Sequence, residues 1–288
     1  MNFQNITVRK LKQLQTIMNI YHKIKRNDCL SHQLWPYFEK GWPESDKTVH
    51  FFWGLGDNQI EKIMEAEKNK EEWWYVDTGY LTEQITRYPS PKINDYDKTY
   101  FRIIKGELHT IRGKVGDGKR LQKLESQGID VKFKGWYTGQ TEHILIAPSS
   151  ETVTRCTNQM SQHEWVELAT KEIRKFTDRP IKFRNKPRPN NEWWNTDIKD
   201  DLKNCHALVT NMSLTAIDAV LNKVPVFTHD NNIASAVSSK DLKYIEKPLK
   251  PGHKTMAGWL NFVAENQFTV EEIEKGVAYK NLMDQQNI

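Results

Sequence analysis

Two stretches of the chain show the same order of features: a short apolar segment, a polar turn, a helical pattern and a second apolar segment. The first stretch has apolar segments at 49–53 and 73–76 with a helical pattern at 60–69 between them, and the second has apolar segments at 143–147 and 207–210. Strands that alternate with helices are typical of parallel sheets. The sequence therefore predicts an α/β fold with two Rossmann-like parallel-sheet domains and a cleft between them.

Periodicity predicts the remaining elements and the domain limits. We expect a basic amphipathic helix at 8–28 and, from the capping box of Thr269 and Glu272, a C-terminal helix at 269–284. The other expected elements are strands at 100–104, 180–184 and 225–227, helices at 163–176, 198–204 and 214–221, and a short helix near Arg120. The expected units are one domain at 1–140, a second at 141–254, and C-terminal helices at 255–288 that pack back on the first domain.

The composition excludes several classes of protein. The 288 residues suffice for two domains of roughly 100 to 150 residues, and the absence of an apolar run of about 18 residues predicts no membrane span. Cys29, Cys156 and Cys205 are widely separated, and the nine histidines do not cluster. We therefore expect a cytoplasmic protein without disulfides or a tightly bound metal. We also expect it to be a monomer; a loosely bound divalent cation is compatible with this composition.

Small polar residues follow the strand expected at 207–210. Asn211, Ser213 and Thr215 lie where this strand meets the next helix, and Asp218 follows about one turn later. Open α/β sheets bind ligands at the carboxyl ends of their strands, and a helix N-terminus offers free N–H groups to a phosphate. A phosphate site with a carboxylate for ribose hydroxyls is one interpretation. The other is that Ser213 only caps the helix.

Two further segments add to this candidate site. Five basic residues lie between positions 179 and 188 among three prolines, and Arg184 and Lys186 are the central ones. Arginine binds phosphate oxygens in a bidentate way, although a lysine-rich edge strand that resists aggregation has the same pattern. Ser149 and Ser150 form a third strand-end turn suited to contacting a ligand.

These segments, in this order, resemble the donor half of GT-B glycosyltransferases of the capsule-polysaccharide type and their phage-encoded relatives. Arg184 and Lys186 match the family's R-x-K/H-P element, and Ser213 and Asp218 match its T-x-x-S-x-x-x-x-E/D-A element, with Asp in place of the usual Glu. Val224 stands where glycine is common. The resemblance spans about residues 143–230. It implies a nucleotide-sugar donor, of UDP type, bound by the second domain without a DxD metal motif.

The first domain resembles the same family at one turn. Asp77 ends the strand at 73–76 in a segment similar to the family's E-D-G-F-L turn, which carries an acidic catalytic residue. Inverting transfer needs a carboxylate that deprotonates the acceptor hydroxyl. Asp77 is the expected base and Asp57 the alternative; an Asx-turn role for Asp77 also fits. The other expected acceptor-side residues are Gly54, Asn58 and Tyr80.

Three hypotheses concern the acceptor. The favoured one is the hydroxyl of 5-hydroxymethylcytosine in double-stranded phage DNA, because residues 9–26 and 102–134 are basic and could contact phosphates. A base taken out of the stack could contact one of several tryptophans: Trp42, Trp53, Trp73, Trp74 or Trp136. The alternative is a capsule or lipopolysaccharide glycan. The third hypothesis is a binding module without turnover.

Overall fold

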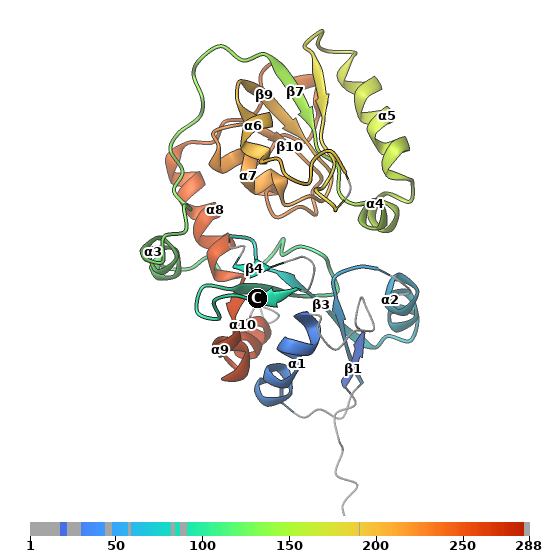
Figure 1. The fold of residues 1–288 in the computed structure, drawn as a ribbon, viewed down its shortest axis with the longest axis vertical. Helices are drawn as coiled ribbons and strands as arrows, with labels where there is room; N and C mark the ends of the chain where they lie inside the picture. The colour runs from blue at the N-terminus through green and yellow to red at the C-terminus, as the bar shows by residue number, and fades with distance from the viewer. Residues whose placement is uncertain are drawn as a thin grey trace, which may run out of the picture.

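The computed structural model describes residues 18–21, 30–43, 48–56, 59–81, 84–86, 91–189 and 191–284, with the backbone alone for 18–21. These residues form two α/β units, one above the other in Figure 1. The strands are β1 (Met18–Tyr21), β2 (Val49–Trp53), β3 (Glu72–Thr78), β4 (Ile85–Thr86), β5 (Lys92–Ile93), β6 (Tyr100–Lys105), β7 (His143–Ile146), β8 (Ile181–Phe183), β9 (Cys205–Val209), β10 (Val226–Phe227) and β11 (Phe268–Thr269). The helices are α1 (Leu30–Gly41), α2 (Gln59–Lys68), α3 (Lys119–Ser126), α4 (Glu151–Asn158), α5 (Gln162–Ile173), α6 (Ile198–Leu202), α7 (Thr215–Leu221), α8 (His253–Glu265), α9 (Val270–Glu274) and α10 (Val277–Asp284), with 3-10 turns at Ser235–Val237 and Leu242–Tyr244.

The first unit contains a mixed sheet with the order β1-β2-β3-β6-β11. Strands β1, β2 and β3 are parallel, whereas β6 pairs antiparallel with β3, and β11 antiparallel with β6. The prediction of a purely parallel sheet is therefore wrong for this unit. The reason is that the chain returns from β3 to β6 through the small β4–β5 hairpin and not through a crossover helix.

The prediction of one helix at 8–28 is also wrong for residues 18–21, the part of this stretch that the structure describes. Residues Met18–Tyr21 form β1, the edge strand that pairs with β2 from Val49 to Phe52. The rest of that stretch lies outside the described residues. A short apolar segment of this kind fits both a helix and an edge strand with alternating side chains. The spacing of the apolar residues alone therefore does not distinguish the two.

The second unit contains the parallel sheet that the sequence predicts, with the order β10-β9-β7-β8. All four residues of β7 are buried, as is typical of a strand with helices on both faces. Ile144 and Ile146 pack toward α5, while Leu145 packs with the apolar side of α7. Helix α4 was not expected from the sequence.

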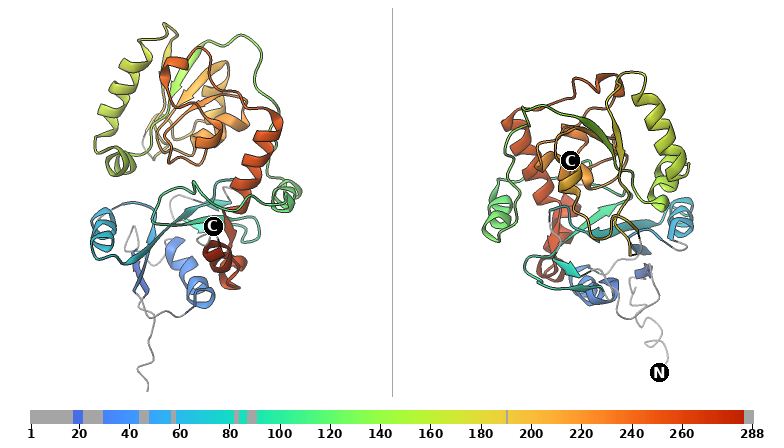
Figure 2. Two further views of the ribbon diagram at one scale, coloured as in Figure 1. Left: turned by 180° about the vertical axis from the view of Figure 1, so that it is seen from behind. Right: turned by 45° about the horizontal axis from the view of Figure 1, so that its top comes forward.

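The two units share an apolar cluster. Tyr80, Leu81 and Tyr100 of the first unit pack in the same cluster as Leu145 of the second and Trp259 of α8. The chain passes between the units twice, first through residues 106–142 and then through α8 (Figures 1 and 2). Helix α3, in the first crossing, packs against α8, in the second.

The second crossing ends in β11, which joins the sheet of the first unit, and in α9, which packs against α1. Thr269 and Glu272 form the predicted capping box at the start of α9. The predicted helix at 269–284 is divided into α9 and α10, because Gly276 adopts a φ of 70°, a conformation that interrupts a helix.

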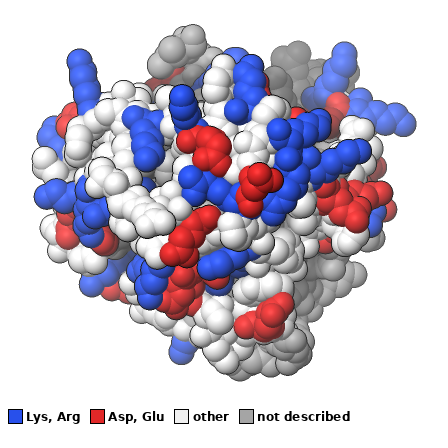
Figure 3. Space-filling model, turned by 90° about the horizontal axis from the view of Figure 1, so that it is seen from above, with Lys and Arg blue, Asp and Glu red and all other residues white. Residues whose placement is uncertain are grey.

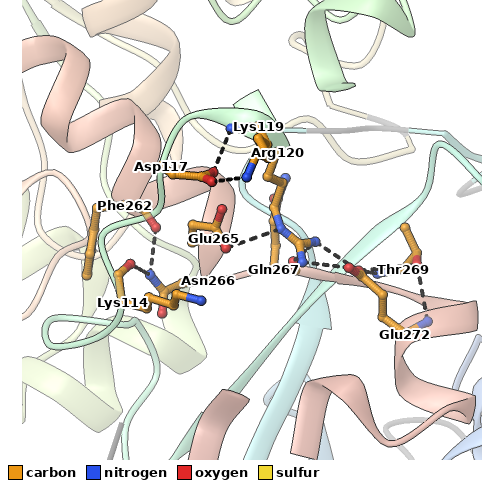
Figure 4. A network of polar contacts seen from close by, with 10 residues as sticks. All are labelled: Lys114, Asp117, Lys119, Arg120, Phe262, Glu265, Asn266, Gln267, Thr269 and Glu272. Atoms are coloured by element: carbon orange, nitrogen blue, oxygen red, sulfur yellow. Dashed lines mark hydrogen bonds and ion pairs between the residues drawn. The ribbon is translucent and has the colours of Figure 1, made fainter. Parts of the chain in front are cut away.

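Arg120 of α3 ties the two crossings together (Figure 4). Its guanidinium donates to both carboxylate oxygens of Glu272 at 2.8 and 2.5 Å and to the backbone oxygen of Gln267 at 3.0 Å. The carboxylate of Glu265 lies 3.7 Å from its Nε. The guanidinium also lies 5.7 Å from the centroid of the Phe268 ring. Only 13% of the Arg120 side chain is exposed, so water weakens these interactions little.

We expect Arg120→Met to lower the free energy of unfolding by about 3 kcal/mol, because it leaves two poorly exposed carboxylates without their cation. Chemical denaturation followed by tryptophan fluorescence measures this change. Lys119→Met is the matched control, since Lys119 precedes Arg120 in the same helix but is 85% exposed and pairs only with Asp117. Equal losses in the two variants would contradict a special role for Arg120.

Candidate functional site

The carboxyl ends of β7 and β9 face the first unit. Helix α4, which follows β7, places Val153 against the apolar cluster of Phe52 and Leu55 in the first unit. The backbone N–H of Ile233, in the loop after β10, donates to Nδ1 of His109 in the first unit at 3.2 Å. The strand ends of the second sheet and the turn after β3 therefore border the same interdomain region.

Asn211 and Ser149 hold the ends of β7 and β9 together. The Asn211 side chain accepts from the Ser149 amide at 2.8 Å and donates to Thr154 and Asn158 of α4. The Ser149 hydroxyl accepts from the Met212 amide at 3.0 Å. Both residues were expected to contact a donor, but the structure places their side chains in internal hydrogen bonds. These hydrogen bonds connect the turns after β7 and β9, and contact with a donor stays a prediction for both residues.

The turn after β9 carries the other expected donor-binding residues of that segment. The Ser213 hydroxyl accepts from the Thr215 amide at 3.3 Å, and Asn232 donates to the Ser213 backbone oxygen at 3.2 Å. The Thr215 hydroxyl is buried and has no hydrogen-bond partner among the described residues. Asp218 is exposed one turn later, and Ser150 precedes the first residue of α4.

Arg184 does not present a free guanidinium to a ligand. Its side chain is 4% exposed and forms an ion pair of 2.5 Å with Asp201. It also donates to the hydroxyl and the backbone oxygen of Thr196, both at 3.0 Å. These internal contacts hold the guanidinium, and a phosphate contact of Arg184 stays a prediction. Strand β8 ends at Phe183, so the alternation that would place Arg184 beside Lys182 does not continue.

Asn185 and Lys186, which follow Arg184, are candidates for contact with a ligand. The side-chain oxygen of Asn185 is buried without a hydrogen-bond partner in the described part of the chain. Lys186 is exposed, and its charge acts on Asp77 of the first unit. Buried polar atoms in folded proteins are nearly always hydrogen-bonded. Asn185, in the loop after β8, and Thr215, at the start of α7, thus each have a buried oxygen without a hydrogen-bond partner among the described residues.

Asp77 lies at the carboxyl end of β3, opposite Arg102 in the register of β6. Its carboxylate pairs with Arg102 at 3.0 Å and accepts from the Tyr75 hydroxyl at 2.7 Å and the Thr78 amide at 2.8 Å. Burial alone would raise its pKa. The charges of Arg102 and Lys186 and these hydrogen bonds outweigh burial and lower the pKa to about 2. With 29% of its side chain exposed, Asp77 is an ionised acceptor at the edge of the interdomain region.

Arg102 is a site residue that the sequence did not single out. Its guanidinium lies 5.4 Å from the ring centroid of Tyr75 and 5.5 Å from that of Tyr80, and only 6% of the side chain is exposed. It was counted within the basic run at 102–134. The available signal was its position as a charge with apolar residues on both sides in β6, where a buried cation needs a carboxylate partner.

His109 connects the two units. Burial and the nearby Arg102 charge lower its pKa well below 6.5, despite the opposing effect of Asp77. Because Nδ1 accepts from Ile233, the neutral ring carries its proton on Nε2. His109 is therefore a hydrogen-bond donor at neutral pH. Its ring packs edge-on against Tyr80 at 6.1 Å between centroids.

The expected acceptor-side residues fall into three groups. Tyr80 is buried, with its hydroxyl bonded to the hydroxyl and amide of Thr110. Gly54 has a φ of 62° and donates to the Val76 backbone oxygen at the end of β2. Asp57 and Asn58 lie outside the described residues.

Some of the features that favoured DNA are internal, whereas six basic side chains of the run at 102–134 are exposed: Arg112, Lys114, Lys119, Lys123, Lys132 and Lys134. Trp42, Trp73 and Trp74 are core residues, and Arg102 and Arg120 are buried in ion pairs. Figure 3 shows acidic side chains between the basic ones across the face that the second unit turns away from the first. Among the described residues of this face, acidic side chains interrupt the basic ones, an arrangement that does not favour duplex DNA there. All lysines and arginines before position 30 lie outside the described ranges.

The described residues contain neither a metal-binding cluster nor a membrane-spanning helix. No group of three or more histidine, cysteine or acidic side chains suited to holding a metal ion is found among them. None of the helices in the described ranges is long and apolar enough to cross a membrane.

Comparison with known proteins gives a remote likeness. No family model matches the chain, and no curated protein matches it. Two solved structures from Thermosulfurimonas dismutans are similar. The beta Kdo 2,4 transferase of KpsC has a TM-score of 0.48 at 10% identity, with 86% of this chain and 90% of that chain covered. The beta Kdo 2,7 transferase of KpsC has a TM-score of 0.47 at 9% identity, with 92% and 99% covered.

The buried His109 predicts acid sensitivity. Its pKa is depressed in the folded protein, so its contribution to stability is complete above pH 6.5, the ordinary histidine pKa, and is lost as the pH falls below it. We expect the free energy of unfolding to fall by about 1 kcal/mol more in the wild type than in His109→Asn between pH 7 and 5.5. The asparagine oxygen can still accept from Ile233.

Urea denaturation at both pH values measures this difference. Asp77 does not interfere, because its stabilising effect is lost only below about pH 4, as the pH falls toward 2. A parallel fall in the two proteins would contradict the assignment of a neutral, buried His109.

Proposed function

We propose that this chain is a glycosyltransferase that moves a sugar from a nucleotide-sugar donor, of UDP type, to a hydroxyl group. The observation that carries the proposal is the position of the ionised Asp77 carboxylate. It borders the region at the carboxyl ends of the second sheet, and Lys186, in the loop after β8, is close enough to act on it electrostatically. Ligands of open α/β sheets bind at such strand ends.

The donor is proposed to lie along the ends of β8, β7 and β9. Lys186 would face the diphosphate and stabilise the negative charge that builds up on the leaving group. The unsatisfied oxygens of Asn185 and Thr215 would be satisfied by the nucleotide. Asp218, exposed one turn beyond Thr215, remains the proposed acceptor of ribose hydroxyl hydrogen bonds. Arg184, Ser149 and Asn211 act indirectly, because their internal bonds hold these turns in place.

Asp77 is the proposed base of an inverting reaction. A carboxylate with a pKa of about 2 does not remove a proton from a resting hydroxyl, but it can accept a hydrogen bond from one. The hydroxyl becomes much more acidic as its oxygen bonds to the sugar carbon. The proton passes to Asp77 at that stage, and Arg102 holds the carboxylate in the required orientation. His109 cannot take this role, because its Nδ1 lone pair is occupied by the Ile233 amide.

We propose a glycan hydroxyl as the acceptor in preference to 5-hydroxymethylcytosine in DNA. Transfer to a base in DNA needs phosphate contacts along the duplex and a site for a flipped base. Three of the five candidate tryptophans are core residues, and Arg102 and Arg120 are held in ion pairs, although the lysines of the run at 102–134 are mostly exposed. Transfer to a glycan hydroxyl needs a catalytic base and a donor site that face an open surface. The DNA hypothesis remains a prediction that the acceptor assay below decides.

Asp77→Asn is expected to lower transfer by at least about 100-fold, because it removes the proton acceptor. The measurement is incorporation of label from a panel of nucleotide sugars into capsular oligosaccharides and into hydroxymethylcytosine DNA. Nucleotide affinity should stay unchanged, which also shows that the variant is folded. Asp97→Asn, in an exposed turn, is the control. Full activity of Asp77→Asn would refute the base assignment, and label in DNA alone would refute the glycan acceptor.

Lys186→Ala is expected to raise the KM for the donor about tenfold, since it removes the positive charge proposed to face the diphosphate. Lys182→Ala is the matched control, because Lys182 is an exposed lysine on β8, the strand that precedes the Lys186 loop. Steady-state kinetics with the donor varied gives both values. A similar rise in the two variants would indicate a general effect of surface charge and would contradict a phosphate contact.

A further inference from the structure

Gln267 is a fully buried polar residue between α8 and β11. Its side-chain oxygen accepts hydrogen bonds from two consecutive backbone amides in the turn after β3, Tyr80 at 2.7 Å and Leu81 at 3.0 Å. These bonds join segments 187 and 186 residues apart in the sequence. The Gln267 side chain thus supplies the hydrogen-bond acceptor for two amides of the turn, as a backbone carbonyl of a neighbouring strand would.

The same turn is held from its other side by β6. The Gly79 amide donates to the Tyr100 backbone oxygen at 2.7 Å. A Cβ atom at Gly79 would lie 2.7 Å from that oxygen and 2.8 Å from the Gln267 side-chain oxygen. Both distances are too short for any residue but glycine. The turn from Asp77 to Leu81 is therefore closely confined between β6 and Gln267.

The backbone of Gln267 is itself tied to the interdomain network of Figure 4. Arg120 donates to its carbonyl oxygen at 3.0 Å and is anchored by Glu272. One residue thus contacts the network at its main chain and the Asp77 turn at its side chain. If the second crossing moved relative to the first unit, Gln267 would move with it and would displace the Asp77 turn through its hydrogen bonds to Tyr80 and Leu81.

We infer that Gln267 is a positioning residue, which sets the Asp77 turn relative to the second unit, and that Arg120 links it to the interdomain crossings. Gln267 is fully buried and acts without touching a substrate. Its effect on catalysis rests on the proposed function of Asp77. Its effect on the turn does not, so the two can be tested separately.

Amide hydrogen exchange, resolved by NMR, tests the structural part. Gln267→Ala should speed exchange at the Tyr80 and Leu81 amides about tenfold, as expected for the loss of one hydrogen bond each. The Gly79 amide, bonded to Tyr100, should change little. Gln267→Glu keeps an acceptor oxygen and should restore protection. Arg120→Met should speed the same two amides by a smaller factor.

Asn266→Ala is the matched control. Asn266 is the adjacent buried residue, and its side chain bonds to the Lys114 and Phe262 backbone oxygens instead of the turn. It should leave the Tyr80 and Leu81 amides protected. Equal exchange in the Gln267→Ala and Asn266→Ala variants would overturn the inference, as would unchanged exchange in Gln267→Ala.

Kinetics test the catalytic part. Gln267→Ala should lower kcat about tenfold and leave the donor KM unchanged, and Gln267→Glu should recover activity. Faster amide exchange with unchanged kcat would overturn the catalytic role of Gln267. If the wild type shows no transfer to any acceptor, the proposed function fails, while the exchange experiment still decides whether Gln267 positions the turn.

Discussion

The ion pairs of Arg120 with Glu272 and Glu265 lie where the two crossings between the units meet. Most other ion pairs in the described chain are exposed and contribute little to stability, since water and side-chain entropy offset their attraction. The Arg120 side chain is 13% exposed, and its partners are 12% and 22% exposed. Removing one member of such a cluster leaves a poorly hydrated charge. The relative position of the two sheets therefore depends on this cluster and on the apolar packing of α3 against α8.

A second buried pair, Arg102 with Asp77, organises the site in the same way. The register of β3 and β6 places the two residues directly opposite each other, and the rings of Tyr75 and Tyr80 flank the guanidinium. The pair keeps a carboxylate ionised next to a cation of the second unit, Lys186. Burial costs these charges solvation, and their mutual attraction offsets it. The pair makes Asp77 a weak base but a well-oriented one.

The local elements were mostly predictable, whereas several long-range partners were not. The strands near 49–53, 143–147 and 207–210 follow from short apolar runs between turns. Helix α4 is not evident from the sequence because it is rich in threonine, which has a low helix propensity. In the structure, its Val153 packs on the first unit, a long-range contact that favours the helix. The direction of β6 depends on the β4–β5 connection, which periodicity does not reveal. No pattern near Arg184 identifies Asp201, 17 residues away, as its partner.

We propose that a nucleotide binds between the strand ends of the second unit and the Asp77 turn of the first. Hydrogen exchange measured with and without saturating nucleoside diphosphates tests it most directly. If a nucleotide binds there, we expect slower exchange at residues 149–150, 185–186 and 213–215, together with the turn at 77–81. Protection confined to other segments, or no change with any nucleotide, would contradict it.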